Sequence, residues 1–78
     1  MNKLKLKEAT QERVIYLYQP EGRGSFGEIC ATGAEDEAEI LVRADEDETG
    51  YYGRMACVKI KEFLEKKNLS MEYTQAWY

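Results

Sequence analysis

Hydrophobic and polar residues alternate with a period of two along the first part of the chain, which is the pattern of β-strands. Asn2–Glu8 alternates lysine with leucine, and we expect it to form a short basic strand at a sheet edge, with a flexible tail over residues 1–10 as the alternative. Arg13–Gln19 is the strongest strand signal, with β-branched, aromatic and aliphatic residues in its middle. Both faces of this strand are apolar, with Val14, Tyr16 and Tyr18 on one and Ile15 and Leu17 on the other.

Two further strands are expected downstream of this one. The glycine-rich segment Pro20–Ser25 has the composition of a turn, and Phe26–Thr32 follows as a second, weaker strand. After a polar turn at Gly33–Glu37, Ala38–Ala44 forms the third strand, with Ala38, Ile40 and Val42 facing inward. Short turns between consecutive strands predict an antiparallel meander.

A helix is predicted over Tyr51–Lys67, where apolar residues recur at helical spacing. The acidic run Asp45–Thr49 precedes it, and Asp47 or Thr49 can cap its N-terminus. Asn68 is suited to end the helix in the left-handed conformation, with Leu69 closing over the last turn. Ser70–Tyr78 then alternates Met71, Tyr73 and Trp77 and predicts a final strand. The apolar stripe of the helix consists of Tyr52, Ala56, Ile60, Phe63 and Leu64, with Cys57 beside it.

The order of these elements predicts the α+β class. We expect one domain over residues 1–78, with an antiparallel sheet in the order β-β-β-α-β, the N-terminal segment as an extra strand, and one helix packed on one sheet face. A single helix covers only one face of the apolar strand, so the other face must meet a second layer or a second copy. We therefore predict a homodimer. The predicted interaction surface comprises Ile15, Leu17, Tyr16, Tyr18, Tyr73 and Trp77.

Composition narrows the classes of function. The formal charge of −4 disfavours contact with nucleic-acid phosphates, and the apolar runs are too short to span a membrane. The chain has no histidine and two cysteines, which we interpret as reduced core residues of a cytoplasmic protein. We expect no metal, no cofactor and no catalytic activity. Five acidic residues could offer oxygen ligands to a divalent cation but are interpreted as a solvated face: Asp36, Glu37, Asp45, Asp47 and Glu48.

One segment has the pattern of a nucleotide-binding loop. Residues 22–27, Gly-Arg-Gly-Ser-Phe-Gly, resemble the glycine-rich loop of protein kinases, in which backbone N–H groups approach phosphates closely. Kinase chemistry also needs a lysine on the third strand and a second lobe, and neither is encoded in these 78 residues. We therefore interpret the segment as a hairpin turn. The alternative is a small-ligand or nucleotide site formed by Gly22, Arg23, Gly24, Ser25 and Gly27.

Two resemblances bear on function. Residues Tyr18, Pro20, Glu21, Gly22 and Gly24, with Tyr-Tyr-Gly at 51–53 and Ala-Trp-Tyr at 76–78, resemble a family of small uncharacterised bacterial proteins of the Firmicute type. That resemblance implies no activity. The element order is also similar to that of HicB-type antitoxins, which bind a toxin, although their Asp-Gly and Pro-Gly-Cys features are missing. The main hypothesis is a self-associating, non-catalytic interaction module. The alternatives are the ligand-binding loop and an acidic, antitoxin-like partner of an unidentified protein.

Overall fold

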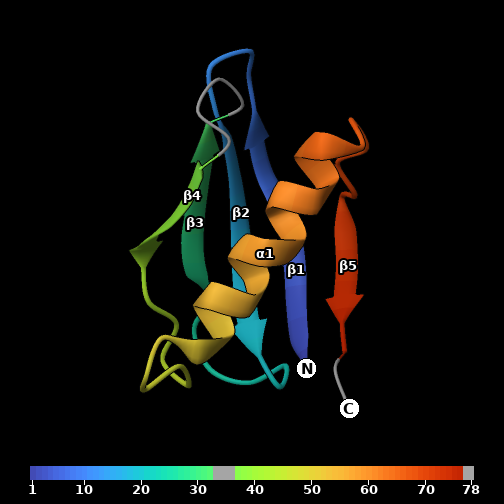
Figure 1. The fold of residues 1–78 in the computed structure, drawn as a ribbon. Coiled ribbons are helices and arrows are strands. Elements are labelled where there is room, and N and C mark those ends of the chain that lie inside the picture. The colour runs from blue at the N-terminus through green and yellow to red at the C-terminus, as the bar shows by residue number, and fades with distance from the viewer. Residues whose placement is uncertain (33–36, 77–78) are drawn as a thin grey trace.

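The computed structural model describes residues 1–32 and 37–76, which form an antiparallel five-stranded sheet and one helix (Figure 1). The sheet order is β4-β3-β2-β1-β5, and every neighbouring pair is antiparallel. This arrangement confirms the predicted α+β class and helix-on-sheet architecture. The elements are β1 (Asn2–Ala9), β2 (Val14–Pro20), β3 (Gly27–Thr32), β4 (Glu37–Val42), α1 (Tyr51–Glu65) and β5 (Glu72–Gln75).

Strand β1 occupies an interior position in the sheet. It pairs with β2 on one side and with the last strand, β5, on the other, where Leu4 lies opposite Tyr73. The sequence-based placement of this segment at a sheet edge was therefore wrong. The lysine-leucine alternation fixed the two faces of the strand correctly, but it carried no information about a partner nearly seventy residues away.

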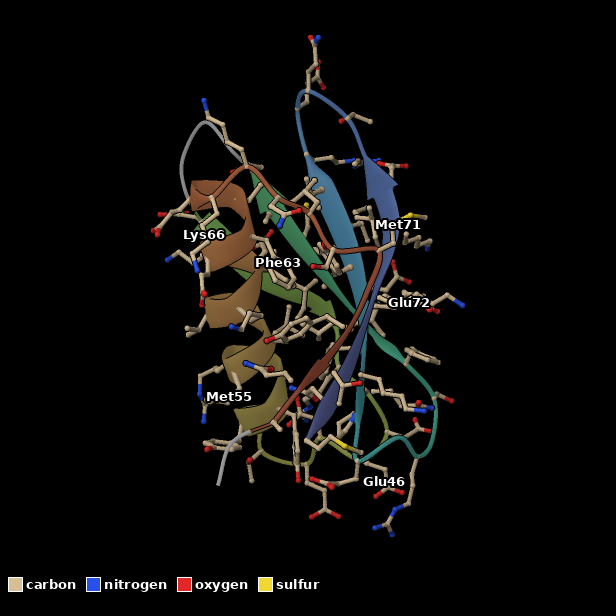
Figure 2. The ribbon with its side chains drawn as sticks, turned by 90° about the vertical axis from the view of Figure 1, so that its right-hand side faces the viewer. Glu46, Met55, Phe63, Lys66, Met71 and Glu72 are labelled. Carbon is tan, nitrogen blue, oxygen red and sulfur yellow. The ribbon has the colours of Figure 1, made fainter. Side chains whose placement is uncertain are left out.

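Helix α1 crosses one face of the sheet diagonally, because it connects edge strand β4 to the opposite edge strand β5 (Figure 1). Figure 2 shows Phe63 directed from the helix toward the sheet. The ring of Phe63 packs against Tyr16 at 5.8 Å between ring centroids, which joins the helix to β2. The buried core is formed by Leu4, Val14, Tyr16, Tyr18, Ile29, Ala31, Ala44, Ala56, Ile60 and Phe63.

The helix begins at Tyr51 after the N-cap residue Gly50. Both predicted capping side chains accept N–H groups of its first turn, Thr49 from Tyr51 at 3.3 Å and Asp47 twice. The Asp47 Oδ1 accepts a hydrogen bond from the Tyr52 N–H at 3.1 Å, and its Oδ2 accepts one from the Gly53 N–H at 3.0 Å. These are helix N–H groups that have no partner within the helix, and a carboxylate also complements the helix dipole. At Gly53 a Cβ atom would overlap the Ile40 side chain, so the helix approaches the sheet closely at this position.

The helix ends at Glu65 with Lys66 as its C-cap, and the left-handed residue that follows is Lys67 rather than Asn68. Lys67 adopts a positive φ of 54°, and the Asn68 N–H donates to the Phe63 carbonyl at 3.0 Å. The Lys67 N–H also donates to the Leu64 carbonyl at 3.1 Å, which completes a Schellman motif. The prediction of a left-handed terminator was therefore one residue late.

Strand β4 departs from regular pairing near its end. The register with β3 shifts between Glu28 and Ile29, so that Val42 pairs with Glu28 whereas Ile40 pairs with Ile29. This bulge turns Val42 away from the core, and the residue is 49% exposed. The prediction that Val42 faces inward was wrong, whereas Ala38 and Ile40 pack against the core as expected.

A buried amide pair fastens β5 to the rest of the fold. The Asn2 Nδ2 donates to the Tyr52 carbonyl at 2.9 Å and to the Gln75 Oε1 at 3.2 Å. The Gln75 Nε2 in turn donates to the Met55 carbonyl at 2.8 Å. These bonds join β1, β5 and α1, so the short final strand is held by side chains as well as by its ladder with β1.

Candidate interaction face

The sheet face turned away from α1 is the candidate functional surface, and we call it the open face. No helix or strand of the described residues packs on it, and in Figure 2 Met71 and Glu72 lie on the side away from helix residues Met55 and Lys66. Strand alternation, pairing and the lining of the depression described below place the following residues on it: Lys3, Lys5, Lys7, Glu8, Ile15, Leu17, Gln19, Phe26, Glu28, Cys30, Thr32, Glu37, Glu39, Val42, Glu72 and Thr74.

An apolar strip runs along the middle of the open face. Ile15 is 8% exposed, yet it is not part of the core cluster beneath the helix, because its side chain points to the other side of β2. Leu17 and Cys30 are half-buried beside it. Val42, which is 49% exposed, extends the strip toward β4, and Phe26, which is 38% exposed, extends it toward Lys3 and Gln19. The strip is therefore apolar at its centre and still accessible along its flank.

Opposite charges border this strip on its two sides. Strand β1 contributes Lys3, Lys5 and Lys7, whereas Glu28 lies on β3 and Glu37 and Glu39 on β4. The Lys7 Nζ reaches across β2 to the Glu28 Oε1 at 3.1 Å, and both side chains are partly exposed. Within the described residues, Lys3, Lys5 and Glu39 make no ion pair. The open face thus carries its lysines on β1 and most of its glutamates on β3 and β4, with Glu72 of β5 opposite Lys5 and Glu8 of β1 opposite Ile15.

A shallow depression of about 360 Å³ lies at the β5 end of the open face. Its lining mixes two lysines of β1 with two aromatic rings and a carboxylate. The lining residues are Lys3, Leu4, Lys5, Gln19, Phe26, Glu72, Tyr73 and Thr74.

Two residues of the predicted interaction surface belong to the core instead. Tyr16 and Tyr18 have no exposed surface and lie between β2 and the helix. The Tyr16 hydroxyl donates to the Ser70 carbonyl at 2.6 Å, and the Tyr18 hydroxyl donates to the Asp47 Oδ2 at 2.7 Å. Burial raises the pKa of each tyrosine to about 12. Their inclusion in the interaction surface is therefore corrected, whereas Ile15 and Leu17 do lie on the open face.

The other two predicted surface residues lie elsewhere. Tyr73 is on the helix side of β5, where its ring meets Phe63 edge to face at 5.3 Å and the Lys59 Nζ lies 5.2 Å from its centroid. It is 36% exposed, so it forms the rim of the core. Trp77 lies outside the described residues.

The glycine-rich loop has the geometry of a turn bordered by carboxylates. The Arg23 N–H donates to the Pro20 carbonyl at 3.1 Å, and the Ser25 N–H donates to the Asp45 Oδ2 at 3.2 Å. A carboxylate on a loop amide occupies the place that a phosphate would need and repels other anions. Gly27 is buried in β3, where a Cβ atom would overlap the Tyr18 ring. The geometry therefore favours the hairpin turn, and Gly22 and Gly24 belong to that turn.

The remaining candidate groups are dispersed. In the part of the chain that the structure describes, no three residues among histidine, cysteine, aspartate and glutamate converge on one point. Asp47 is buried as the helix cap, and Asp36 lies outside that part of the chain. Cys30 and Cys57 are both free thiols, and burial raises the pKa of the Cys57 thiol. A thiol held in its protonated form is a poor nucleophile.

Sequence reasoning missed the charged borders of the open face. The lysine alternation in Asn2–Glu8 was visible, but its assignment to a sheet edge separated it from Leu17 and Glu28. A signal was available in the alternation of Glu37 and Glu39, which marks a strand with one acidic face. The two rows become neighbours of one apolar strip only through the order of strands in the sheet.

Comparison with protein-family models, with curated proteins and with solved structures found no match for this chain. The resemblances to the Firmicute-type family and to HicB-type antitoxins therefore stay predictions. Among the described residues, no helix is both long and apolar enough to cross a membrane.

Proposed function

We propose that this chain is a non-catalytic protein-interaction module that self-associates through the open face of its sheet. The observation that carries the proposal is that one helix covers one face of the five-stranded sheet, while Ile15, Leu17 and Phe26 form an apolar strip on the other. Burial of apolar surface is the main favourable term in association, and identical chains most often pair with two-fold symmetry.

The chemistry of the side chains supports a binding role over a catalytic one. The chain has no histidine, and the described thiol and carboxylate groups do not form a nucleophile-base pair. The most extensively hydrogen-bonded polar pair is Asp47 with Tyr18, and both side chains are buried. Asp47 accepts helix N–H groups, so this pair has a structural role. What the surface offers a partner is shape, apolar area and charge.

Light scattering coupled to size exclusion tests the proposal. We expect the wild-type chain to elute as a dimer at micromolar concentration. Leu17→Arg places two like charges at the centre of the contact and should give a folded monomer. Val58→Arg is the matched control, because Val58 is 62% exposed on the helix, away from the sheet. A wild-type monomer across this range, or equal effects of both variants, would overturn the proposal.

A further inference from the structure

The two residues that flank Leu17 across the open face carry opposite charges, within the row Glu72, Lys5, Leu17, Glu28 and Val42. Lys5 pairs with Leu17 on one side, and Leu17 pairs with Glu28 on the other. Neighbouring strands are about 4.8 Å apart, so the lysine and the glutamate lie at equal distances from β2. A half-turn about an axis parallel to β2 and above Leu17 exchanges the positions of the two charged residues.

We propose that the partner of the open face is a second copy of this chain, related by a two-fold axis that runs parallel to β2. In this dimer β1 of each copy lies over β3 of the other, Lys5 faces the partner's Glu28 twice, and the two Leu17 side chains meet at the axis. The inference rests on the proposed self-association and adds the arrangement of the two copies.

Charge decides between this axis and its main competitor. Two sheets stacked face to face can also be related by a two-fold axis that runs between them and across the strands. This axis places β1 of one copy over β1 of the other. That arrangement sets Lys3, Lys5 and Lys7 against the same lysines of the partner, and the glutamates of β3 and β4 against one another. Like charges brought together in an interface disfavour a wrong arrangement strongly. The axis parallel to β2 instead places the lysines of β1 over β3, where Lys5 meets Glu28, and places the acidic residues of β4 toward β5 of the partner.

The size of the face suits such a dimer. The molecule measures 30 × 23 × 17 Å, so a face formed by its two longer dimensions covers several hundred Å². A standard stable interface buries about 800 Å² per partner. Exposed ion pairs contribute little to affinity, so the apolar strip supplies most of the binding and the charged rows select the orientation. Within each copy the Glu28 Oε1 is paired with Lys7, so the Oε2 of Glu28 is the oxygen left for Lys5 of the other copy.

Charge reversal with mixing tests the arrangement. Lys5→Glu makes position 5 and Glu28 both acidic, and Glu28→Lys makes both basic, so each variant alone should dimerise at least about tenfold more weakly than wild type. Mixed in equal amounts, the two variants should form a heterodimer, because both contacts then join opposite charges. The double variant Lys5→Glu/Glu28→Lys should recover homodimers with near wild-type affinity. Native mass spectrometry distinguishes the species.

The controls separate the arrangement from self-association itself. Lys61→Glu and Glu65→Lys, on the helix, reverse the same charges away from the open face and should leave dimerisation unchanged. If Leu17→Arg abolishes the dimer but the mixed variants fail to form heterodimers, the proposed function stands and this axis is wrong. If the wild-type chain is itself monomeric, both the proposed self-association and the proposed axis are wrong. Recovery in the mixture and in the double variant is the expected result.

Discussion

The Tyr18 hydroxyl donates a 2.7 Å hydrogen bond to the Oδ2 of Asp47, and this bond joins the central strand to the start of the helix. The same hydroxyl accepts the Ala44 N–H at 3.1 Å, while Asp47 accepts the N–H groups of Tyr52 and Gly53. All the groups that the two buried side chains present here have partners. These bonds form only when the first turn of α1 lies beside Tyr18. The pair therefore fixes the position of α1 along β2.

Replacement of Asp47 should destabilise the fold strongly. Asp47→Ala leaves two helix N–H groups and the Tyr18 hydroxyl without an acceptor, and we expect a loss of about 2–4 kcal/mol in the free energy of unfolding. Asp47→Asn retains one carbonyl oxygen and should lose less. Urea denaturation followed by circular dichroism measures both. Glu48→Ala is the control, since Glu48 is exposed and only one residue away. A loss below that of Glu48→Ala would contradict the capping role.

Stability should fall as the pH rises through the alkaline range. Burial raises the pKa of Tyr16 and Tyr18 to about 12 from the ordinary value of 10.0. The folded state therefore holds these protons longer than the unfolded state does. The stabilisation is complete below pH 10 and is lost progressively between pH 10 and about 12. Denaturation curves across this range should show the decline, and Tyr16→Phe should make it shallower. A flat profile would be inconsistent with both tyrosines remaining protonated in the fold.

Gly53 should resist substitution although it lies inside a helix. Alanine is the better helix former by about 1 kcal/mol, so Gly53→Ala would stabilise an isolated helix. Here the added Cβ overlaps the Ile40 side chain, and overpacking typically costs about 1–3 kcal/mol. We expect a net loss of stability in thermal denaturation. Adding Ile40→Val, which removes the clashing Cδ1, should recover part of it. A stabilised Gly53→Ala would show that helix and sheet are not in close contact at this point.

The helix should tolerate charge on one face only. Ile60 has no exposed surface and packs in the core, whereas Val58 is 62% exposed two residues earlier. An unpaired buried carboxylate costs several kcal/mol, which is a large part of the stability of so small a domain. Ile60→Asp should therefore unfold the protein, and Val58→Asp should retain the wild-type circular dichroism spectrum and melting temperature within a few degrees. Similar spectra for the two variants would contradict this placement of the helix.

Local patterns were sufficient for most of the fold. Period-two alternation identified four of the five strands within a few residues, and helical spacing identified α1 and its buried residues Ala56, Ile60 and Phe63. Asp47 was recognisable as a cap because acids before a helix have few other local roles. The N-terminal strand was also visible, with a flexible tail left open as the alternative. These features depend on backbone geometry over a few residues, which is what a sequence encodes locally.

The sequence by itself determined which residues are strand, helix and turn, and which two faces β2 presents. Only the tertiary structure decided which face the helix covers, because Val14–Tyr18 is apolar on both sides and periodicity cannot choose between them. It also decided that β1 is an interior strand, through a ladder with β5 from the other end of the chain. That pairing brings Lys5 beside Leu17 and Glu28, so the candidate site exists only in the folded sheet. Strand order is set by the summed burial and pairing of the whole chain, and no local segment encodes it.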